Sequence, residues 1–315
     1  MRNNGSIVAD NIRKSTITTA SDPTALNYRE VDEFLQMAYE STEFLKGIRT
    51  VTRRSTSGTI DKIGVTGRNL RSKKENVPVS NGAEPKMSSV PYSTEPIILP
   101  WDITEEQIRQ EQRVRGQDYE DIIMQGMTRN FGENMQDLGF NGDKSTPNTD
   151  PDYDFLKIND GWLKKARITG NYIDWSTLPD AEKMGVLFNL ERAIPTRLRA
   201  SGIFKYFMHP NTYSQRLEYL AKMDTSASVQ IQIMGAQNKI NSYEVEEVPH
   251  MPEGTILFTY KPNFLLVNTY DIIIRKTTEG KEAVWGDKRF YAIHTDMDSI
   301  FEEPAAVAMV EGVKF

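Results

Sequence analysis

A stretch of about fifty residues, 48–100, limits the possible folds of this 315-residue chain more than any other. Its first part, IRTVTRRSTSGTIDKIGVTGR, is rich in Thr, Ile and Val and predicts a β-hairpin with a turn at Ser57-Gly58. Its second part holds Pro78, Pro85, Pro91, Pro96 and Pro100. Proline at this density excludes a helix and leaves extended, edge-like chain. Because such a segment is unusual inside a compact domain, we expect it to leave its own core and lie on a neighbouring chain.

Charge is distributed unevenly along the chain, although the net charge is only −6. Residues 46–74 hold nine basic side chains against one acid, whereas residues 102–121 hold seven acids against three arginines. Neighbouring blocks of opposite charge favour contact within a chain or between copies. We therefore predict an intersubunit contact between a basic and an acidic set, namely Arg53, Arg54, Arg68, Arg71, Lys73 and Lys74 with Glu105, Glu106 and Glu111.

The basic segment has two other interpretations. It is either a solvated hairpin with no partner or a site for nucleic acid. Aromatic side chains are almost absent from it, so base stacking is poorly served and phosphate contact alone remains.

The stretch NGDKSTPNTDPDYDFLKIND alternates Asp150, Asp152 and Asp154, as a calcium-binding loop does. An EF-hand loop that starts at Asp150 needs Gly at its sixth position and Glu at its twelfth. This chain has Phe155 and Gly161 there, so the sharp turn and the bidentate ligand are both missing. We expect a solvated connection rather than a metal site. Whether its aspartates contact a neighbouring subunit or only water stays open.

Residue types and motifs that carry chemistry are scarce. The chain has no cysteine, which excludes disulfides, thiolate zinc sites and iron–sulfur clusters. Its three histidines, His209, His250 and His294, show no metal-ligand spacing, and no Gly-rich phosphate loop or nucleophile motif occurs. We expect no enzymatic activity, no cofactor and no metal. Neither a signal peptide nor a transmembrane span is predicted.

The longest helical signal lies at 117–138. Its apolar residues recur at helical spacing and form one stripe, made of Ile123, Met127, Phe131, Met135 and Leu138. A short amphipathic helix is expected before the extended stretch, a mixture of helices and strands after residue 175, and a β-rich tail.

This order of elements resembles the major capsid proteins of tailed bacteriophages, which have the Hong Kong 97-type fold. Local sequence supports the resemblance: LGFNGD ends the long helix, LKINDGWLKKA follows the Asp-rich loop, and FMHPNTYSQRLEYL and FYAIHTDMDSIFEEPAAVAMV come later. The resemblance covers most of residues 28–315 and implies an α+β fold.

The resemblance implies six segments: a flexible N-terminal arm (1–27), an amphipathic helix (28–47), an extended β-hairpin loop called the E-loop (48–100), a peripheral domain with a spine helix (101–175), an axial α/β domain (176–268) and the C-terminal β-sheet of the peripheral domain (269–315). In such proteins the E-loop lies over the adjacent subunit. Some members are cross-linked through a Lys and an Asn; the sequence does not identify such a pair here, and cross-linking stays open.

The function that the resemblance implies is structural. The chain would self-assemble, as pentamers and hexamers, into the icosahedral head shell of a tailed phage and enclose double-stranded DNA through non-specific contacts. Its other partners would be a portal protein and a separate scaffolding protein. It would be a virion component assembled in the host cytoplasm, with no membrane partner. The alternatives are an encapsulin-like compartment with a protein cargo and, less favoured, a mixed α/β enzyme.

Overall fold

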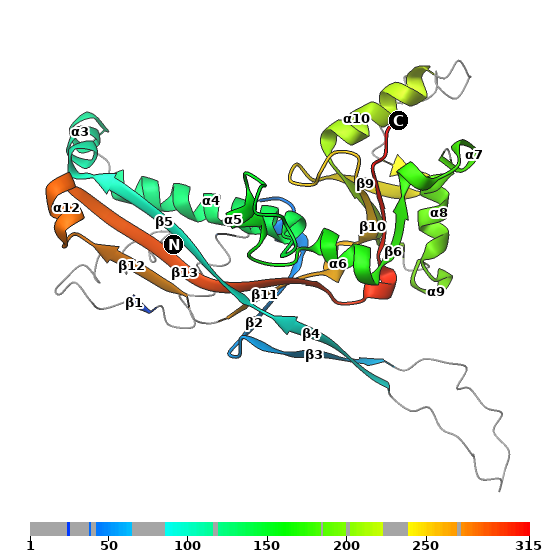
Figure 1. Ribbon diagram of the computed structural model, residues 1–315, viewed down its shortest axis with the longest axis horizontal. Coiled ribbons are helices and arrows are strands. Elements are labelled where there is room, and N and C mark those ends of the chain that lie inside the picture. Colours follow the sequence, from blue (N-terminus) through cyan, green and yellow to red (C-terminus); the bar gives the residue numbers. More distant parts are fainter. Residues whose placement is uncertain are drawn as a thin grey trace, which may run out of the picture.

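The computed structural model describes residues 24–25, 38, 42–64, 86–115, 119–183, 185–199, 202–222, 239–269 and 272–315. The described chain is elongated (Figure 1). One sheet, with a long helix along it, reaches one end of the molecule, and a second sheet with its own helices forms the other end. A two-stranded ribbon projects away from both.

The first sheet is built around the long strand β13. Its strands are β1 (Thr24–Ala25), β2 (Arg49–Arg53), β5 (Glu95–Thr104), β11 (Phe264–Thr269), β12 (Ile273–Thr277) and β13 (Lys288–Phe301). β13 is antiparallel to β5, β11 and β12, and β2 joins the sheet parallel to β11. The helix α12 (Lys281–Gly286) connects β12 to β13 at the far end of the sheet.

The long helix α4 (Tyr119–Asn141) lies along the first sheet and confirms the helix predicted at 117–138. Phe131, Met135 and Leu138 are buried in the main hydrophobic cluster, and Ile123 and Met127 are partly buried against it. The helix α3 (Glu105–Arg115) precedes α4. A stripe at helical spacing thus buries one face of α4 against the sheet, as its sequence pattern requires.

The second sheet has the order β6-β14-β10-β7-β9-β8. Its strands are β6 (Asn171–Asp174), β7 (Phe204–Met208), β8 (Lys239–Ile240), β9 (Tyr243–Glu247), β10 (Ile256–Tyr260) and β14 (Ala308–Glu311). Four helices belong to the same part of the chain: α7 (Asp180–Lys183), α8 (Val186–Ala193), α9 (Thr196–Arg199) and α10 (Pro210–Lys222). Leu190, Tyr206 and Phe258 are fully buried in its separate core. Short 3₁₀ turns complete the described elements, at Leu45–Gly47, Trp175–Thr177, Lys261–Asn263 and Pro304–Ala306.

The projecting ribbon consists of β3 (Ser57–Gly64) and β4 (Lys86–Ser93), which pair antiparallel. Its root is fixed by a small apolar cluster in which Ile60 and Tyr92 pack on Leu265 and Ile300 of the first sheet. Further out, Lys62 pairs with Glu303 of the body, and Asp61 and the residues 87–89 are exposed. Among the described residues the ribbon therefore contacts the body near its root.

The hairpin predicted around Ser57-Gly58 is wrong. β2 does not pair with β3 but with β11, and β3 pairs with β4. Gly58 lies inside β3, where a Cβ atom would come 2.9 Å from the Tyr92 hydroxyl oxygen, so this glycine makes room for a ring instead of forming a turn. Local strand propensity was correct, but the choice of partner is a tertiary property.

Several strands lie outside the segments expected for them. β14 belongs to the second sheet, although residues 269–315 were expected to complete the first. β11 belongs to the first sheet, although it falls almost wholly within 176–268, the segment expected to form the axial domain. β2 and β5 also belong to the first sheet, although β2 and much of β5 fall within 48–100, the segment expected to form the E-loop. The division into domains stays a prediction. Most of the predicted arm and amphipathic helix lies outside the described residues.

The prolines of β5 agree with the prediction of edge-like chain. Pro96 lies opposite Asp296 and Pro100 opposite Ala292, and among the described residues β13 is the one strand that pairs with β5. Along an antiparallel strand the backbone N–H groups point alternately to one edge and to the other, so residues four apart share an edge. Pro96 and Pro100 therefore both lack a donor at the same edge of β5. Since the ladder to β13 is intact, that side is the outer edge, where missing donors hinder the addition of a further strand.

Two glycines close the Asp-rich loop. It leaves α4 at Gly142, passes through α5 (Tyr153–Leu156), and returns to α6 (Trp162–Thr169) at Gly161. The amide of Gly161 donates to the carbonyl oxygen of Gly142 at 2.7 Å. A Cβ on Gly142 would overlap the carbonyl oxygen of Asn159, and one on Gly161 would lie 2.7 Å from that of Phe140. Gly161 is the N-cap of α6, and no side chain caps the helix there.

We predict that Gly161→Ala lowers the free energy of unfolding by roughly 1–3 kcal/mol, because the new methyl group forces apart two backbone segments. Gly126→Ala is the matched control. Gly126 lies within α4 with no atom within 4 Å of its Cβ position, so alanine should stabilise the helix by roughly 0.5–1 kcal/mol. Denaturant unfolding of both variants measures the difference. Equal effects, or effects of the same sign, would contradict the proposed close approach.

Candidate functional site

The structure places part of the predicted basic contact set. Arg53 ends β2 and is exposed, and Arg54 follows it and is exposed as well. The other four, Arg68, Arg71, Lys73 and Lys74, lie outside the described residues. Two further bases of the block have partners in their own chain: Arg49 donates to Glu302 at 2.8 Å, and Lys62 to Glu303 at 3.0 Å.

Glu105 and Glu106 of the predicted acidic contact set already have hydrogen-bond partners within their own chain. Glu105 begins α3 and is held by Arg289, whose Nη2 donates to its Oε2 at 3.0 Å. Glu106 is exposed and accepts a hydrogen bond from Gln110 of the next helical turn. Glu111 belongs to α3, but its side chain is outside the description. Sequence analysis missed Arg289, because the register of β5 and β13 brings it to the start of α3.

Asp298 joins three segments at the root of the ribbon. Its carboxylate accepts hydrogen bonds from the Ser93 amide at 2.9 Å, from Lys165 Nζ at 2.6 Å and from Asn159 Nδ2 at 3.3 Å. The side chain of Asp298 is 4% exposed and that of Lys165 is 26% exposed. One buried carboxylate therefore ties the end of β4 to α6 and to the Asp-rich loop. Separating paired charges at a buried site is costly. The contacts of Asp298 therefore hold the end of β4 in place and fix the point at which the ribbon leaves the body.

We predict that Asp298→Asn lowers the free energy of unfolding by roughly 2–3 kcal/mol, because it leaves the Lys165 ammonium without its carboxylate. The value is reduced from that of a fully buried pair, since Lys165 is partly exposed. Asp180→Asn serves as the control: Asp180 pairs with Lys183 at 2.7 Å, but its side chain is 95% exposed, and we expect a much smaller loss. Urea unfolding at neutral pH measures both, and comparable losses would show that Asp298 is no special anchor.

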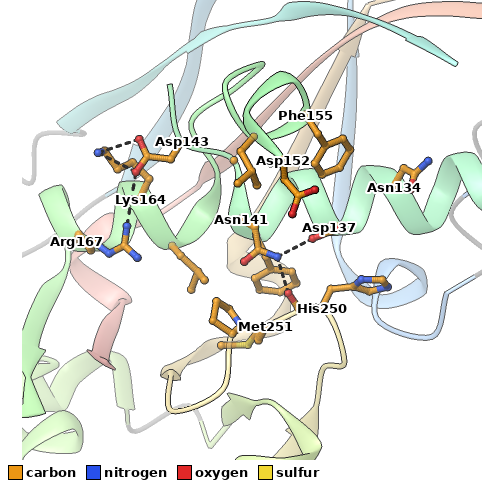
Figure 2. Close-up of a pocket in the computed structure, with 15 residues that line it drawn as sticks. Asn134, Asp137, Asn141, Asp143, Asp152, Phe155, Lys164, Arg167, His250 and Met251 are labelled. Atoms are coloured by element: carbon orange, nitrogen blue, oxygen red, sulfur yellow. Dashed lines mark hydrogen bonds and ion pairs between the residues drawn. The ribbon is translucent and has the colours of Figure 1, made fainter. Parts of the chain in front are cut away.

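A hollow of about 700 Å³ lies where the two halves of the molecule meet (Figure 2). It is bounded by the end of α4, the Asp-rich loop with α5, the helix α6, and the turn at residues 250–252 that follows β9. Polar side chains from these elements line it, notably Asn134, Asp137, Asn141, Asp143, Asp152, Lys164 and Arg167. Phe155, Leu156, Leu163, Met251 and Pro252 supply its apolar lining.

Asn141 fixes one wall of the hollow. Its amide nitrogen donates to Asp137 Oδ1 at 2.6 Å and to the carbonyl oxygen of His250 at 2.7 Å (Figure 2). The first contact lies within α4, and the second reaches the turn that belongs to the second sheet. The end of the long helix is thereby tied to the other half of the molecule.

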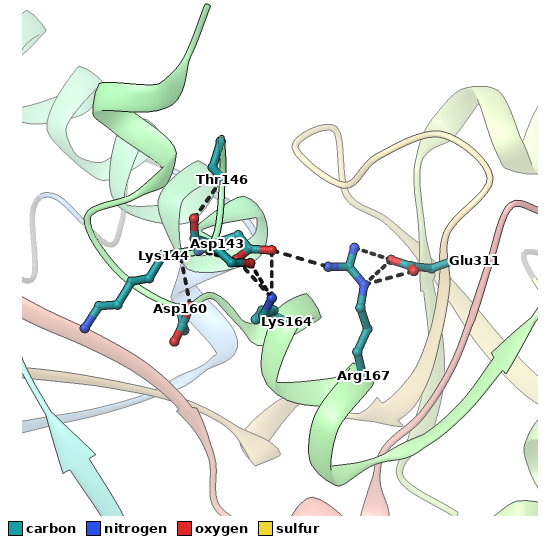
Figure 3. Close-up of polar contacts among 8 residues, drawn as sticks. Asp143, Lys144, Thr146, Asp160, Lys164, Arg167 and Glu311 are labelled. Carbon is teal, nitrogen blue, oxygen red and sulfur yellow. Dashed lines mark hydrogen bonds and ion pairs between the residues drawn. The ribbon is translucent and has the colours of Figure 1, made fainter. Parts of the chain in front are cut away.

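The opposite wall is a chain of charges (Figure 3). Lys164 Nζ donates to Asp143 Oδ2 at 3.1 Å, and Arg167 Nη1 lies 3.9 Å from the same oxygen. Arg167 also holds Glu311 of β14, with Nη2 2.6 Å and Nε 2.9 Å from its carboxylate oxygens. Burial acts to raise the pKa of Asp143, but hydrogen bonds from Ser145 and the contact with Lys164 outweigh it, and the pKa is lowered from 3.8. The carboxylate is thus held in its charged form.

This charge chain should make stability depend on pH in acid. Because the pKa of Asp143 is lower in the folded chain than in the unfolded chain, its contribution is complete above 3.8 and is lost as the pH falls through the lower folded value. We expect the difference in unfolding free energy between the native chain and Asp143→Asn to be constant above about pH 5 and to shrink below it. Denaturant unfolding across this range tests the sign. A difference that grows in acid would be the opposite result.

The three alternating aspartates do not converge on one point. Asp150 Oδ1 accepts from the Asp152 amide at 2.9 Å, and Asp154 pairs with Lys157 at 3.0 Å. Asp152 lines the hollow, whereas the side chain of Asp154 is 95% exposed. Among the described residues no group of three or more His, Cys, Asp or Glu is arranged to hold a metal ion.

Large apolar side chains are exposed at several extremities. Met87 on the ribbon is 75% exposed, Trp285 on α12 is 78% exposed, and Phe188 on α8 is 50% exposed. Figure 1 places these three elements on different projections of the molecule. Exposed apolar surface away from any ligand cavity is typical of surfaces that contact other proteins.

The described fold is that of the Hong Kong 97-type capsid proteins, as expected from the sequence. A subunit of the structure titled "Satellite phage P4 procapsid including size determination (Sid) protein" matches with a TM-score of 0.68 and 18% identity, over 90% of this chain and 99% of that one. A subunit of "Capsid of native GTA particle computed with C5 symmetry" matches at 0.57 and 12%, over 94% of each chain. A chain of "Microbacterium phage Oxtober96" matches at 0.54 and 13%, over 96% and 98%.

One curated relative has a similar length. The "Putative prophage capsid protein YqbE" of Bacillus subtilis (strain 168) is 23% identical over 318 residues, which cover 96% of this chain and 97% of the relative. No protein-family model matches the chain. In the part of the chain that the structure describes, no helix is long and apolar enough to cross a membrane.

Proposed function

We propose that this chain is a major capsid protein, the structural subunit of the icosahedral head shell that encloses the double-stranded DNA of a tailed phage. It acts by binding copies of itself and performs no chemistry. The fold and the full-length likeness to a protein with a capsid name support this assignment. The portal protein, a separate scaffolding protein and non-specifically bound DNA are its proposed further partners, and the virion is its proposed location, reached after assembly in the host cytoplasm.

The observation that carries this proposal is the projecting β3–β4 ribbon. A two-stranded ribbon is marginally stable in water by itself. Here Ile60 and Tyr92 pack on the body near its root and Lys62 pairs with Glu303, while Asp61 and Met87 are exposed. A ribbon of this kind gains stability when it lies on another subunit. Closed shells arise when such heterologous contacts repeat around symmetry axes.

Electron microscopy of the purified protein, expressed alone and together with its neighbouring genes, tests the assignment. We expect shells, tubes or ring-shaped pentamers and hexamers. Monomers under every assembly condition would overturn the proposal. The contents of the shells separate the proposed function from its alternative: double-stranded DNA indicates a phage head, and a protein cargo without nucleic acid indicates an encapsulin-like compartment.

The basic segment is proposed to contact an acidic surface of the next subunit, for which the sequence named Glu105, Glu106 and Glu111. We predict that reversing Arg53, Arg54, Arg68 and Arg71 to Glu impairs assembly and leaves the subunit folded; of these residues, Arg53 and Arg54 are exposed. Sedimentation measures assembly, and circular dichroism measures the fold.

The control reverses four bases that pair locally on the body, Arg129, Lys157, Lys183 and Lys222. It changes the net charge by the same amount and should impair assembly less. Unaffected assembly of the first variant would mean that the basic segment makes no such contact.

A further inference from the structure

The helices α8 and α9 carry a short basic segment in a chain whose net charge is −6. Residues 186–199 hold three arginines, Arg192, Arg197 and Arg199, against one acid, Glu191. Arg192 and Arg197 are exposed, and Arg199 is half-buried. The three lie within about 25 Å of one another, because a chain spans at most about 3.5 Å per residue. We call these three side chains the arginine surface.

The one acid of this segment does not neutralise the arginines. Glu191 Oε1 accepts a hydrogen bond from the Tyr206 hydroxyl at 2.6 Å and from Asn241 Nδ2 at 2.5 Å. Tyr206 is fully buried in β7, so the Glu191 carboxylate is held toward the second sheet. Its position leaves Arg192, the next residue, without a carboxylate.

Neighbouring bases show the contrast. Lys183 pairs with Asp180 at 2.7 Å, and Lys205 pairs with Glu244 at 3.1 Å. None of the three arginines between them forms an ion pair within the part of the chain that the structure describes. The arginine surface is therefore a group of cations that the folded subunit leaves uncompensated.

Arg199 has unused hydrogen-bonding capacity. Its Nε is buried and has no hydrogen-bond partner among the described residues, and its Nη2 lies 3.4 Å from Thr196 Oγ1, which is a long contact. A guanidinium has five N–H donors in a planar fork. Such a group gains most from an anionic acceptor, because charge-assisted hydrogen bonds are the stronger ones.

The arginine surface is held outward by a rigid core. Leu187 and Leu190 of α8 are buried against the second sheet, which leaves Arg192 on the opposite face of the helix. Ile194, between the helices, is fully buried, and Leu198 of α9 packs against the same core. Figure 1 places α8 and α9 on the side of the second half that faces away from the first sheet. The charges are thus fixed in place and open to a partner.

Phosphate groups suit this surface better than scattered carboxylates. The arginine fork binds phosphate oxygens through two parallel hydrogen bonds. Double-stranded DNA presents one phosphate per about 3.4 Å along each strand, so a segment of this length meets several phosphates in any register. An acidic protein is repelled by a polyanion as a whole, and a local group of bases overcomes that repulsion.

We propose that the arginine surface binds the phosphate backbone of the double-stranded DNA enclosed by the shell. The inference rests on the proposed function and deepens it, since it assigns the DNA contact to named residues. It also orients the subunit, because α8 and α9 must then face the interior of the shell.

A DNA titration across salt concentrations tests the contact. Replacing Arg192, Arg197 and Arg199 with Gln removes three charges and keeps polar side chains. We expect the affinity for a short duplex of mixed sequence, measured by fluorescence anisotropy, to fall at least about tenfold at about 50 mM salt. The slope of log affinity against log salt should become shallower by about two to three units, as the loss of three phosphate contacts requires. A slope equal to that of the native chain overturns the inference.

A second variant guards against a loss of fold. The double change Arg192→Gln with Arg197→Gln alters exposed positions and keeps the half-buried Arg199. It should make the slope shallower by about two units, with a native circular dichroism spectrum. A folded double variant that binds DNA as tightly as the native chain contradicts the proposal.

The matched control removes the same number of charges from bases that pair locally, Arg129, Lys157 and Lys222. Changing them to Gln should leave the salt slope at its native value. The basic segment 46–74 is intact in every variant, so its contribution to DNA binding cancels in the comparison. An equal loss in the control would mean that net charge alone matters and that the arginine surface is no particular site.

A contact with another copy is the competing use of this surface. Phe188 is 50% exposed and lies one helical turn before Arg192. We expect the triple arginine variant and Phe188→Ala both to form shells in electron micrographs, with DNA affinity reduced in the first alone. Loss of assembly in both, with DNA affinity at the native level, would assign the surface to a neighbouring subunit and overturn the inference.

These outcomes separate the inference from the proposed function. If the native chain forms shells and the triple arginine variant keeps the native DNA affinity, the DNA contact lies elsewhere and the capsid assignment stands. If the native chain forms no assembly, the proposed function fails first and the inference falls with it.

Discussion

The packing of Trp162 is the interaction on which the arrangement of the molecule depends. Its indole is fully buried, contacts Phe44, Phe140 and Phe264 edge to face, and donates from Nε1 to the Ile300 carbonyl oxygen at 3.0 Å. The chain makes room for it, since a Cβ on Gly139 would lie 2.7 Å from the ring. Aromatic rings at these distances stabilise a core beyond the effect of buried area. The end of α4, the start of α6, and the strands β11 and β13 are located relative to one another by this side chain.

This rigid centre contrasts with the surfaces at the extremities. Asp298, next to the Trp162 cluster, directs the ribbon, and the hydrogen bonds of Asn141 and Arg167 join the two halves of the body. Each of these contacts is satisfied within one chain. The ribbon, α12 and α8, by contrast, present apolar side chains to solvent. A subunit built in this way keeps its own shape and gains further stability from neighbours, which suits a protein whose function is assembly.

Much of the fold could be predicted because its signals are local. The stripe of α4 depends on residues three and four apart, and the prolines of β5 act on their own backbone. The hairpin prediction failed because strand propensity does not identify the partner of a strand. For the same reason the sequence did not show that Glu105 has a partner in its own chain. Arg289 reaches Glu105 only because Thr104 pairs with Lys288 at the end of the β5–β13 ladder. The sequence drew attention to the Asp-rich loop but did not predict the hollow, since its other walls come from α4, α6 and the turn at residues 250–252.

By itself the amino-acid sequence determined the position of the long helix α4, the edge character of residues 95–104, the separation of charge and the scarcity of chemical motifs. Each of these follows from neighbouring residues or from composition. Tertiary structure alone decided that β2 pairs with β11, that β14 joins the second sheet, and that Asp152 and Asp137 share a hollow while Asp154 does not. The reason is that such contacts join residues far apart in the chain, and their free energy depends on how two complete elements pack, which no local pattern records.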